Sequence, residues 1–73
     1  MLPRAGTLRD QVLRFIKSCA SGATADEAAD ALRESILAIR PRVTELSKQG
    51  LIVETEQRRR NVSGRSAIVW RAA

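Results

Sequence analysis

Three hydroxyl side chains, each placed just before a run of helically spaced apolar residues, most strongly limit what this chain can fold into. Thr7 with Asp10, and Thr24 with Glu27, have the capping-box spacing, in which each side chain binds a free backbone N–H of the first helical turn. Ser35 is a favoured N-cap residue for a third segment. The sequence therefore predicts three helices, near residues 7–20, 25–32 and 36–49.

Each of the three segments carries apolar residues three and four positions apart, so each helix has one face suited to burial. With one Phe, one Trp and no Tyr in 73 residues, the core must be built mainly of aliphatic side chains. Pro41 lies inside the third segment, where its missing backbone N–H removes one helical hydrogen bond and favours a kink. We expect a core made of Leu8, Val12, Phe15, Ile16, Leu32, Ile39, Val43, Leu46, Leu51 and Trp70.

Gly50 is the expected stop of the third helix, and two segments rich in β-branched residues follow it, near residues 51–57 and 66–71. The segment between them, QRRRNVSGRS, is polar and basic. Two strands joined by such a loop predict a β-hairpin. The sequence thus predicts an α+β fold in which three helices precede a two-stranded hairpin, as one domain over residues 7–73 after a loose lead-in at 1–6.

The positive charge of the chain is concentrated in its second part. Residues 1–32 carry equal numbers of basic and acidic side chains, so the whole net charge of +5 lies in residues 33–73. A one-sided basic surface attracts polyanions, whereas membrane binding would need an amphipathic helix with a basic polar face. The charge cluster lies instead in the expected loop, which favours nucleic acid as the partner. Its arginines are Arg58, Arg59, Arg60 and Arg65.

The sequence lacks the residues from which most catalytic and metal sites are built. It contains no His, and Cys19 is its single cysteine, which leaves no disulfide framework and no cysteine metal site. Paired carboxylates in an apolar setting and a glycine-rich phosphate loop are also missing. We therefore expect no enzyme activity, no cofactor and no metal. No apolar stretch has the length of a signal core or a membrane span, so a cytoplasmic protein with no membrane partner is expected.

The segment at residues 23–52, ATADEAADALRESILAIRPRVTELSKQGLI, resembles the helix-turn-helix core of winged-helix regulators. In that family a Thr- or Ser-capped helix with inward alanines leads through a tight turn into a Ser-capped recognition helix. The tail RRRNVSGRSAIVWRAA is similar to a basic wing returning through a strand with a Trp. The resemblance covers about residues 7–72, implies a winged helix-turn-helix fold, and looks most like small bacterial or bacteriophage regulators. It rests on Ser35, Ile39, Arg42, Leu46 and Gly50-Leu51-Ile52.

Two parts of the pattern depart from the family. Arg33 and Glu34 stand where the turn often has a glycine and an apolar residue. A non-glycine residue in the left-handed region costs roughly 1–2 kcal/mol, so a wider turn is expected. Base-reading helices usually offer Arg, Asn or Gln, whereas the outward face of the third helix carries Leu37, Pro41, Thr44 and Lys48. Affinity for DNA is therefore more strongly indicated than sequence-specific readout.

By this resemblance the chain is a DNA-binding regulator, either a transcriptional regulator or an excisionase-like architectural factor. The helix at residues 36–49 would enter the major groove of double-stranded DNA, and the basic wing would grip the flanking DNA. A homodimer stays open because a single module buries little surface, although no dimerisation helix is visible. The residues expected to contact DNA are Ser35, Leu37, Arg40, Pro41, Arg42, Thr44, Lys48, Arg58, Arg59, Arg60, Asn61 and Arg65.

Simpler interpretations stand beside these assignments. The wing arginines could form a solvated loop, and Arg40 and Arg42 could solubilise the helix or pair with Glu45. Ser35 is expected first as a helix cap, and Trp70 as a core residue rather than a stacking platform.

A second function class is a winged helix that binds protein, such as a phage-type factor docking on the host transcription or replication machinery. The exposed apolar face that favours it consists of Leu37, Ala38 and Pro41.

Overall fold

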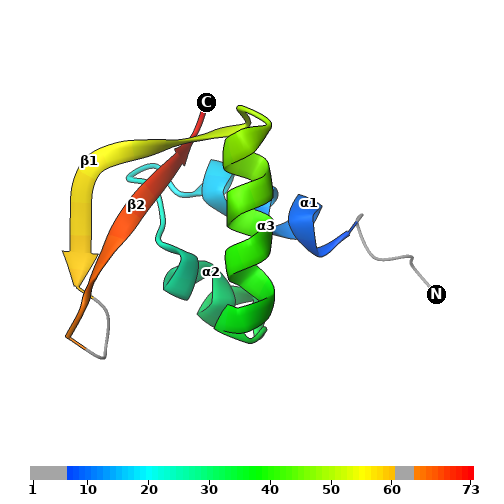
Figure 1. Ribbon diagram of the computed structural model, residues 1–73, viewed down its shortest axis with the longest axis horizontal. Helices are drawn as coiled ribbons and strands as arrows, with labels where there is room; N and C mark the ends of the chain where they lie inside the picture. The colour runs from blue at the N-terminus through cyan, green and yellow to red at the C-terminus, as the bar shows by residue number, and fades with distance from the viewer. Residues whose placement is uncertain (1–6, 61–63) are drawn as a thin grey trace.

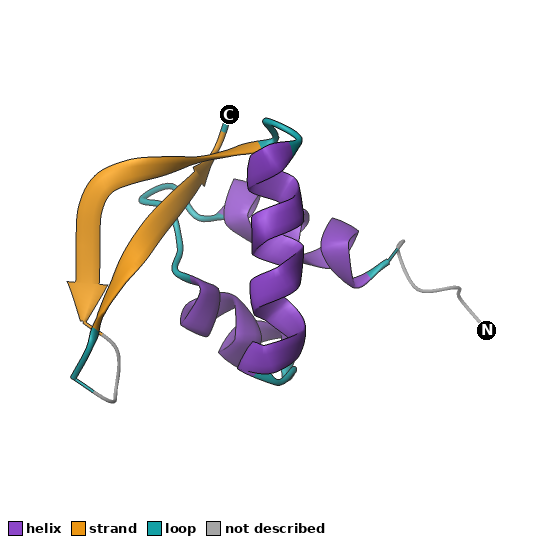
Figure 2. Ribbon diagram, viewed as in Figure 1, coloured by secondary structure: helices purple, strands orange, loops and turns teal. Residues whose placement is uncertain are grey.

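Three helices are followed by a two-stranded antiparallel hairpin in the computed structural model, which describes residues 7–60 and 64–73 (Figure 1). This order confirms the α+β layout expected from the sequence. The helices gather on one side of the molecule, and the hairpin extends along the other (Figure 2). The elements are α1 (Leu8–Ser18), α2 (Ala25–Leu32), α3 (Ile36–Lys48), β1 (Ile52–Arg60) and β2 (Ser66–Ala72).

Side-chain caps begin all three helices, as predicted. Thr24 and Glu27 form a complete capping box for α2, with side-chain to backbone hydrogen bonds of 3.1 and 3.2 Å. Thr7 and Asp10 form the same box for α1. The hydroxyl of Ser35 accepts a hydrogen bond from the backbone N–H two residues later, at 3.1 Å. These caps satisfy backbone donors that would otherwise lack partners, so they fix where each helix starts.

The turn between α2 and α3 stays tight although it contains no glycine. Arg33 adopts the left-handed conformation, with φ 56° and ψ 43°. The backbone N–H of Glu34 then donates to the carbonyl of Ala29 at 2.9 Å, which closes the end of α2. The expectation of a wider turn is therefore wrong. Arg33 adopts a left-handed backbone conformation that is strained for a non-glycine residue, and only residues 33–35 separate the two helices.

The third helix runs through Pro41 without interruption and ends where predicted. Pro41 is exposed, and the carbonyl that it leaves without an intrahelical donor belongs to Leu37, four residues earlier. Gly50 follows the helix with φ 77°, and the next backbone N–H, of Leu51, donates to the carbonyl of Leu46 at 3.0 Å. This left-handed glycine turns the chain from α3 into β1.

One aliphatic core lies between the helices and the sheet. Among the residues expected there, those buried are Val12, Ile16, Ile39, Val43 and Leu46. Partly buried against them are Leu8, Phe15, Leu32 and Trp70. Small and β-branched residues complete the buried set, namely Ala23, Ala28, Ala29, Ile52 and Val69. The two buried alanines of α2 present little side-chain bulk to the elements packed against them.

Leu51 is the one expected core residue that the structure contradicts. Its side chain is 42% exposed, whereas Ile52 is 1% exposed. Leu51 still belongs to the turn that closes α3, and the strand begins one residue later. Because side chains alternate between the two faces of a strand, a shift of one residue exchanges the buried and exposed positions.

Besides the two strands, the sheet includes an isolated bridge at Ala23 that the sequence did not predict. Ala23, between α1 and α2, exchanges two backbone hydrogen bonds of 2.8 Å with Trp70, so β2 lies between Ala23 and β1. Gly22 precedes this bridge with φ +81°, and a Cβ added there would meet the Trp70 carbonyl oxygen at 2.6 Å. The absence of a side chain at Gly22 therefore permits the close approach of the two backbones.

The first strand is longer than predicted and is bent by a bulge. It continues to Arg60, so the prediction that Arg58, Arg59 and Arg60 lie in a loop is wrong. Residues 55–57 lie opposite the single residue Val69, and β1 bends at this position (Figure 1). The Thr55 hydroxyl donates to the Val69 carbonyl at 2.8 Å and accepts from the backbone N–H two residues later at 3.1 Å. These bonds satisfy polar groups that the interrupted pairing leaves free.

Candidate nucleic-acid interface

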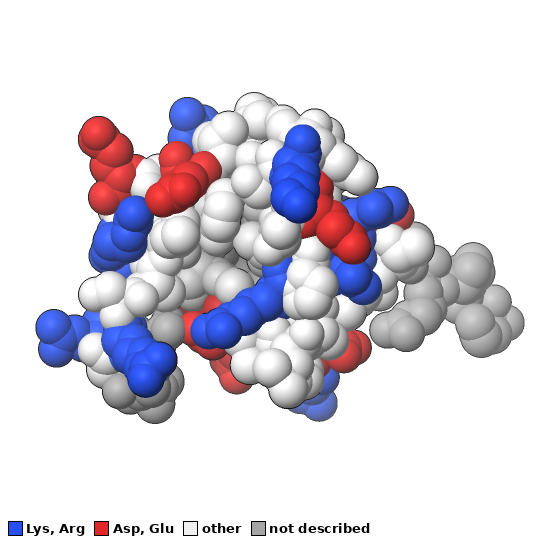
Figure 3. All heavy atoms as spheres, viewed as in Figure 1, with Lys and Arg blue, Asp and Glu red and all other residues white. Residues whose placement is uncertain are grey.

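A groove of about 760 Å³ separates the hairpin from α3. Its walls come from the start of α2, the middle of α3, and β2 together with the hairpin residue just before it. Its lining residues are Ala25, Asp26, Arg40, Val43, Thr44, Arg65, Ser66, Ala67, Ile68 and Trp70. Lys and Arg side chains gather at the end of the hairpin and along α3, on either side of this hollow (Figure 3). The groove is thus bordered by positive charge on two separate elements.

The outward face of α3 is the one that the helical spacing predicted. Arg40, Pro41, Thr44 and Lys48 are exposed. Leu37, one turn before Pro41, is 78% exposed. Arg40 and Thr44 also line the groove, so one edge of this face is continuous with it. The cap residue Ser35 lies exposed at the start of the same helix.

Arg42 points to the opposite side of the helix, toward α1. Its guanidinium donates to Glu45 at 3.0 Å, and Glu45 also lies 3.8 Å from Arg9 of α1. The alternative in which Arg42 pairs with Glu45 is therefore confirmed. Arg42 lines a separate hollow near the start of α1 rather than the groove beside the hairpin.

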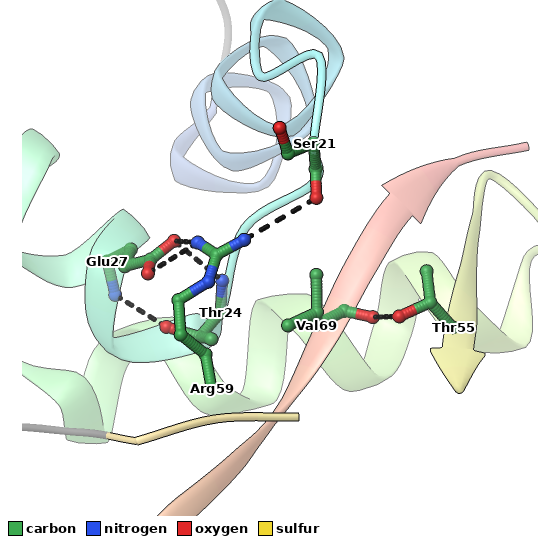
Figure 4. A network of polar contacts seen from close by, with 6 residues as sticks. All are labelled: Ser21, Thr24, Glu27, Thr55, Arg59 and Val69. Atoms are coloured by element: carbon green, nitrogen blue, oxygen red, sulfur yellow. Dashed lines mark hydrogen bonds and ion pairs between the residues drawn. The ribbon is translucent and has the colours of Figure 1, made fainter. Parts of the chain in front are cut away.

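Two of the four hairpin arginines have partners within the molecule. Arg58 lies 3.0 Å from the Glu54 carboxylate and donates to the carbonyl of Thr55 at 3.1 Å, so it stabilises the bulge. Arg59 reaches α2, where its guanidinium donates to both carboxylate oxygens of Glu27 at 2.5 and 2.6 Å (Figure 4). Both guanidinium groups therefore have partners inside the molecule, Arg58 within β1 and Arg59 on α2.

Arg60 and Arg65 flank the end of the hairpin and are exposed. Neither forms an ion pair with any residue in the described part of the chain, and the same holds for Arg40 and Lys48. Asn61, the remaining hairpin residue expected to contact DNA, lies outside the described residues. Of these four exposed cations, Arg40 and Arg65 line the groove, whereas Lys48 and Arg60 lie elsewhere on the same two elements.

The sequence pattern did not reveal the partners of Arg58 and Arg59. Glu54 and Arg58 are four residues apart, a spacing that brings side chains together on a helix, and here the bulge brings them together on a strand. Glu27 and Arg59 are 32 residues apart, and no local rule connects them. Asp26, which contributes an acidic group to the groove, was also missed.

No protein-family model, curated protein or solved structure matches the chain. Among residues 7–60 and 64–73, no helix has the length and apolarity needed to cross a membrane, and no three His, Cys, Asp or Glu residues are grouped to hold a metal ion. The open groove between two basic elements is therefore the feature from which function is inferred.

Proposed function

We propose that this chain is a winged helix-turn-helix domain that binds double-stranded DNA, with α3 as the recognition helix and the hairpin as the wing. One observation carries the proposal: Arg40 on α3 and Arg65 on the hairpin stand on two walls of one groove, without ion-pair partners among the described residues. Two cationic elements on either side of a groove suit the phosphates of one duplex, since phosphate contacts provide most of the affinity and fix the orientation of the protein.

The chemistry of α3 supports backbone and shape recognition more than direct base reading. The helix offers Arg40, Thr44 and Lys48 as donors, which suit phosphates and, for arginine, guanine. Leu37 and Pro41 offer apolar surface that suits thymine methyl groups. We therefore propose a transcriptional regulator or an excisionase-like architectural factor, whose wing uses Arg60 and Arg65 on the flanking groove or backbone.

The test is duplex binding as a function of salt concentration. Replacing Arg60 and Arg65 by Ala should weaken binding to many sequences alike, and it should reduce the salt slope by up to about 1.8, at about 0.9 per neutralised phosphate. The matched control removes two exposed cations from α1, Arg14 and Lys17, which do not line the groove. An equal loss of affinity and slope in the control would show that only net charge matters. A parent protein without duplex affinity at low salt would refute the proposal.

A protein partner is the second candidate, and the 78% exposure of Leu37 favours it. Large apolar side chains with this exposure are ordinary when isolated, but Leu37 lies one turn from the exposed Pro41 on the same helix. In this alternative α3 docks on a host transcription or replication protein. Leu37→Asp should then abolish the interaction, while it should weaken duplex binding less than the loss of Arg60 and Arg65.

A further inference from the structure

The contact between Arg59 and Glu27 joins the far half of β1 to the first turn of α2. Both terminal carboxylate oxygens of Glu27 accept hydrogen bonds from one guanidinium nitrogen of Arg59, and the other terminal nitrogen lies 3.5 Å from the carbonyl oxygen of Ser21 (Figure 4). The two side chains are 38% and 37% exposed, so the pair is partly shielded from water. Charge-assisted hydrogen bonds of this kind fix direction as well as distance.

The Glu27 side of this contact is held rigidly. The Glu27 carboxylate also accepts the backbone N–H of Thr24 at 3.2 Å, as half of the α2 capping box. Thr24 is 1% exposed, so the base of the box is buried. A carboxylate at the start of a helix is further stabilised by the helix dipole. Arg59 therefore binds an acceptor whose position is set by the helical core.

The Arg59 side depends on the bulge in β1. Three residues of β1 stand opposite Val69, and the strand bends there before Arg59 reaches Ala67 in the pairing register. The end of the hairpin beyond this point carries the exposed cations Arg60 and Arg65, which have no ion-pair partner among the described residues. A hairpin fixed only at its base could change its angle to the helices, whereas a second attachment at Arg59 restricts that angle.

We propose that Arg59 is a positioning residue for nucleic-acid binding: its contact with Glu27 fixes the hairpin end opposite α3, so that Arg60 and Arg65 are spaced from Arg40 to suit a stiff duplex. This inference rests on the proposed binding of double-stranded DNA. It assigns the basic wing two separate roles, because Arg59 orders the wing while its neighbours contact the ligand. A preordered wing binds more tightly because less freedom is lost when the complex forms.

Substitution of Glu27 separates this inference from simple electrostatics. Glu27→Gln retains an acceptor suited to the capping box but removes the charge that Arg59 binds. Loss of an acidic group should strengthen binding to a polyanion if only charge matters. If Arg59 positions the wing, duplex binding should instead weaken by roughly two- to tenfold, the range expected when binding must order one further side chain. Glu56→Gln, at an exposed position on β1, is the matched control and should not weaken binding.

Substitution of Arg59 is a second test of the positioning role. Arg59→Lys retains the charge but loses the planar guanidinium, in which one nitrogen binds the Glu27 carboxylate while the other faces the Ser21 carbonyl. A positioning role predicts a loss similar to that of Glu27→Gln, and little further loss when the two changes are combined. A direct phosphate contact predicts that Lys serves nearly as well, because lysine also binds phosphate. Arg60→Lys, at the free end of the hairpin, is the control that should bind like the parent.

Backbone dynamics test the inference without DNA. Nitrogen-15 relaxation in Glu27→Gln should show larger motions at residues 58–60 and 66–68, while the capped start of α2 stays ordered. Unchanged dynamics there would overturn the inference. So would a Glu27→Gln protein that binds duplex as tightly as the parent, together with a salt slope that falls by about 0.9 in Arg59→Ala. If Glu27→Gln loosens the hairpin but the parent protein binds no duplex, the attachment of Arg59 to Glu27 stands and the proposed function is refuted instead.

Discussion

Gly22→Ala should be among the most destabilising single substitutions in this chain. The residue has φ +81°, and the added Cβ would lie 2.6 Å from the Trp70 carbonyl oxygen and 2.8 Å from a methyl carbon of Val69. The first atom belongs to the backbone of the central strand, so no side-chain rotation relieves the contact. The chain must separate at the bridge between Ala23 and Trp70, where two hydrogen bonds of 2.8 Å are made.

The size of the effect follows from two contributions. The left-handed backbone costs a non-glycine residue roughly 1–2 kcal/mol. Weakening two buried backbone hydrogen bonds adds about 0.5–1.5 kcal/mol each. The expected loss of unfolding free energy is therefore about 2–5 kcal/mol, against a total of roughly 4–11 kcal/mol for a domain of this length at the usual stability per residue. Gly22→Ala should lower the midpoint of urea unfolding by a large part of its value.

Gly50→Ala is the matched control for this experiment. Gly50 has nearly the same conformation, φ +77°, but nothing lies within 4 Å of an added Cβ. It should lose only the roughly 1–2 kcal/mol of left-handed strain. Urea unfolding followed by circular dichroism and by the fluorescence of the single Trp measures both variants. Equal losses in the two proteins would show that the close approach of Gly22 to Trp70 contributes nothing to stability, and the reasoning would be refuted.

Three further substitutions test other parts of the fold by the same unfolding measurement. Val43→Ala, at a site 4% exposed, should cost about 2 kcal/mol by the general scale for buried truncations, and an unchanged midpoint would mean that α3 presents another face to the core. Arg33→Gly should raise stability by up to about 1 kcal/mol, because glycine adopts φ 56° without strain; a loss of stability would show that the Arg33 side chain is needed. Thr24→Ala should cost about 1–2 kcal/mol because it removes a buried cap, whereas a cost close to zero would indicate that water replaces the hydroxyl.

The helices and their starts could be predicted because their signals are local. Thr24 and Glu27 lie three residues apart, and the backbone donors that they satisfy lie in the same turn. The stripe on α3 required only helical spacing, and it correctly separated Ile39 and Val43 from the exposed Pro41. The start of β1 was misplaced by one residue because Leu51 is apolar and could belong to either face.

The features that shape the candidate site could not be predicted, because each depends on residues far apart in sequence. The Ala23–Trp70 bridge involves one residue outside any strand, which gives no periodic signal. The Arg59–Glu27 contact exists only after the bulge has bent β1 toward α2. A run of arginines looks uniformly basic in the sequence, yet the fold divides it into residues with internal partners and residues that remain available, such as Arg60.

The central place of β2 in the sheet has a consequence for synthesis on the ribosome. Of the elements described, β2 is the last in sequence, yet it supplies buried Val69 and pairs with both β1 and Ala23. The backbone hydrogen bonds of the helices are local, but the sheet cannot close until residues 66–72 have left the exit tunnel. Until then the inward faces of α1 and α3 have no strand to cover them. Until β2 emerges, the nascent chain thus exposes apolar helix faces, and exposed apolar surface of this kind favours aggregation.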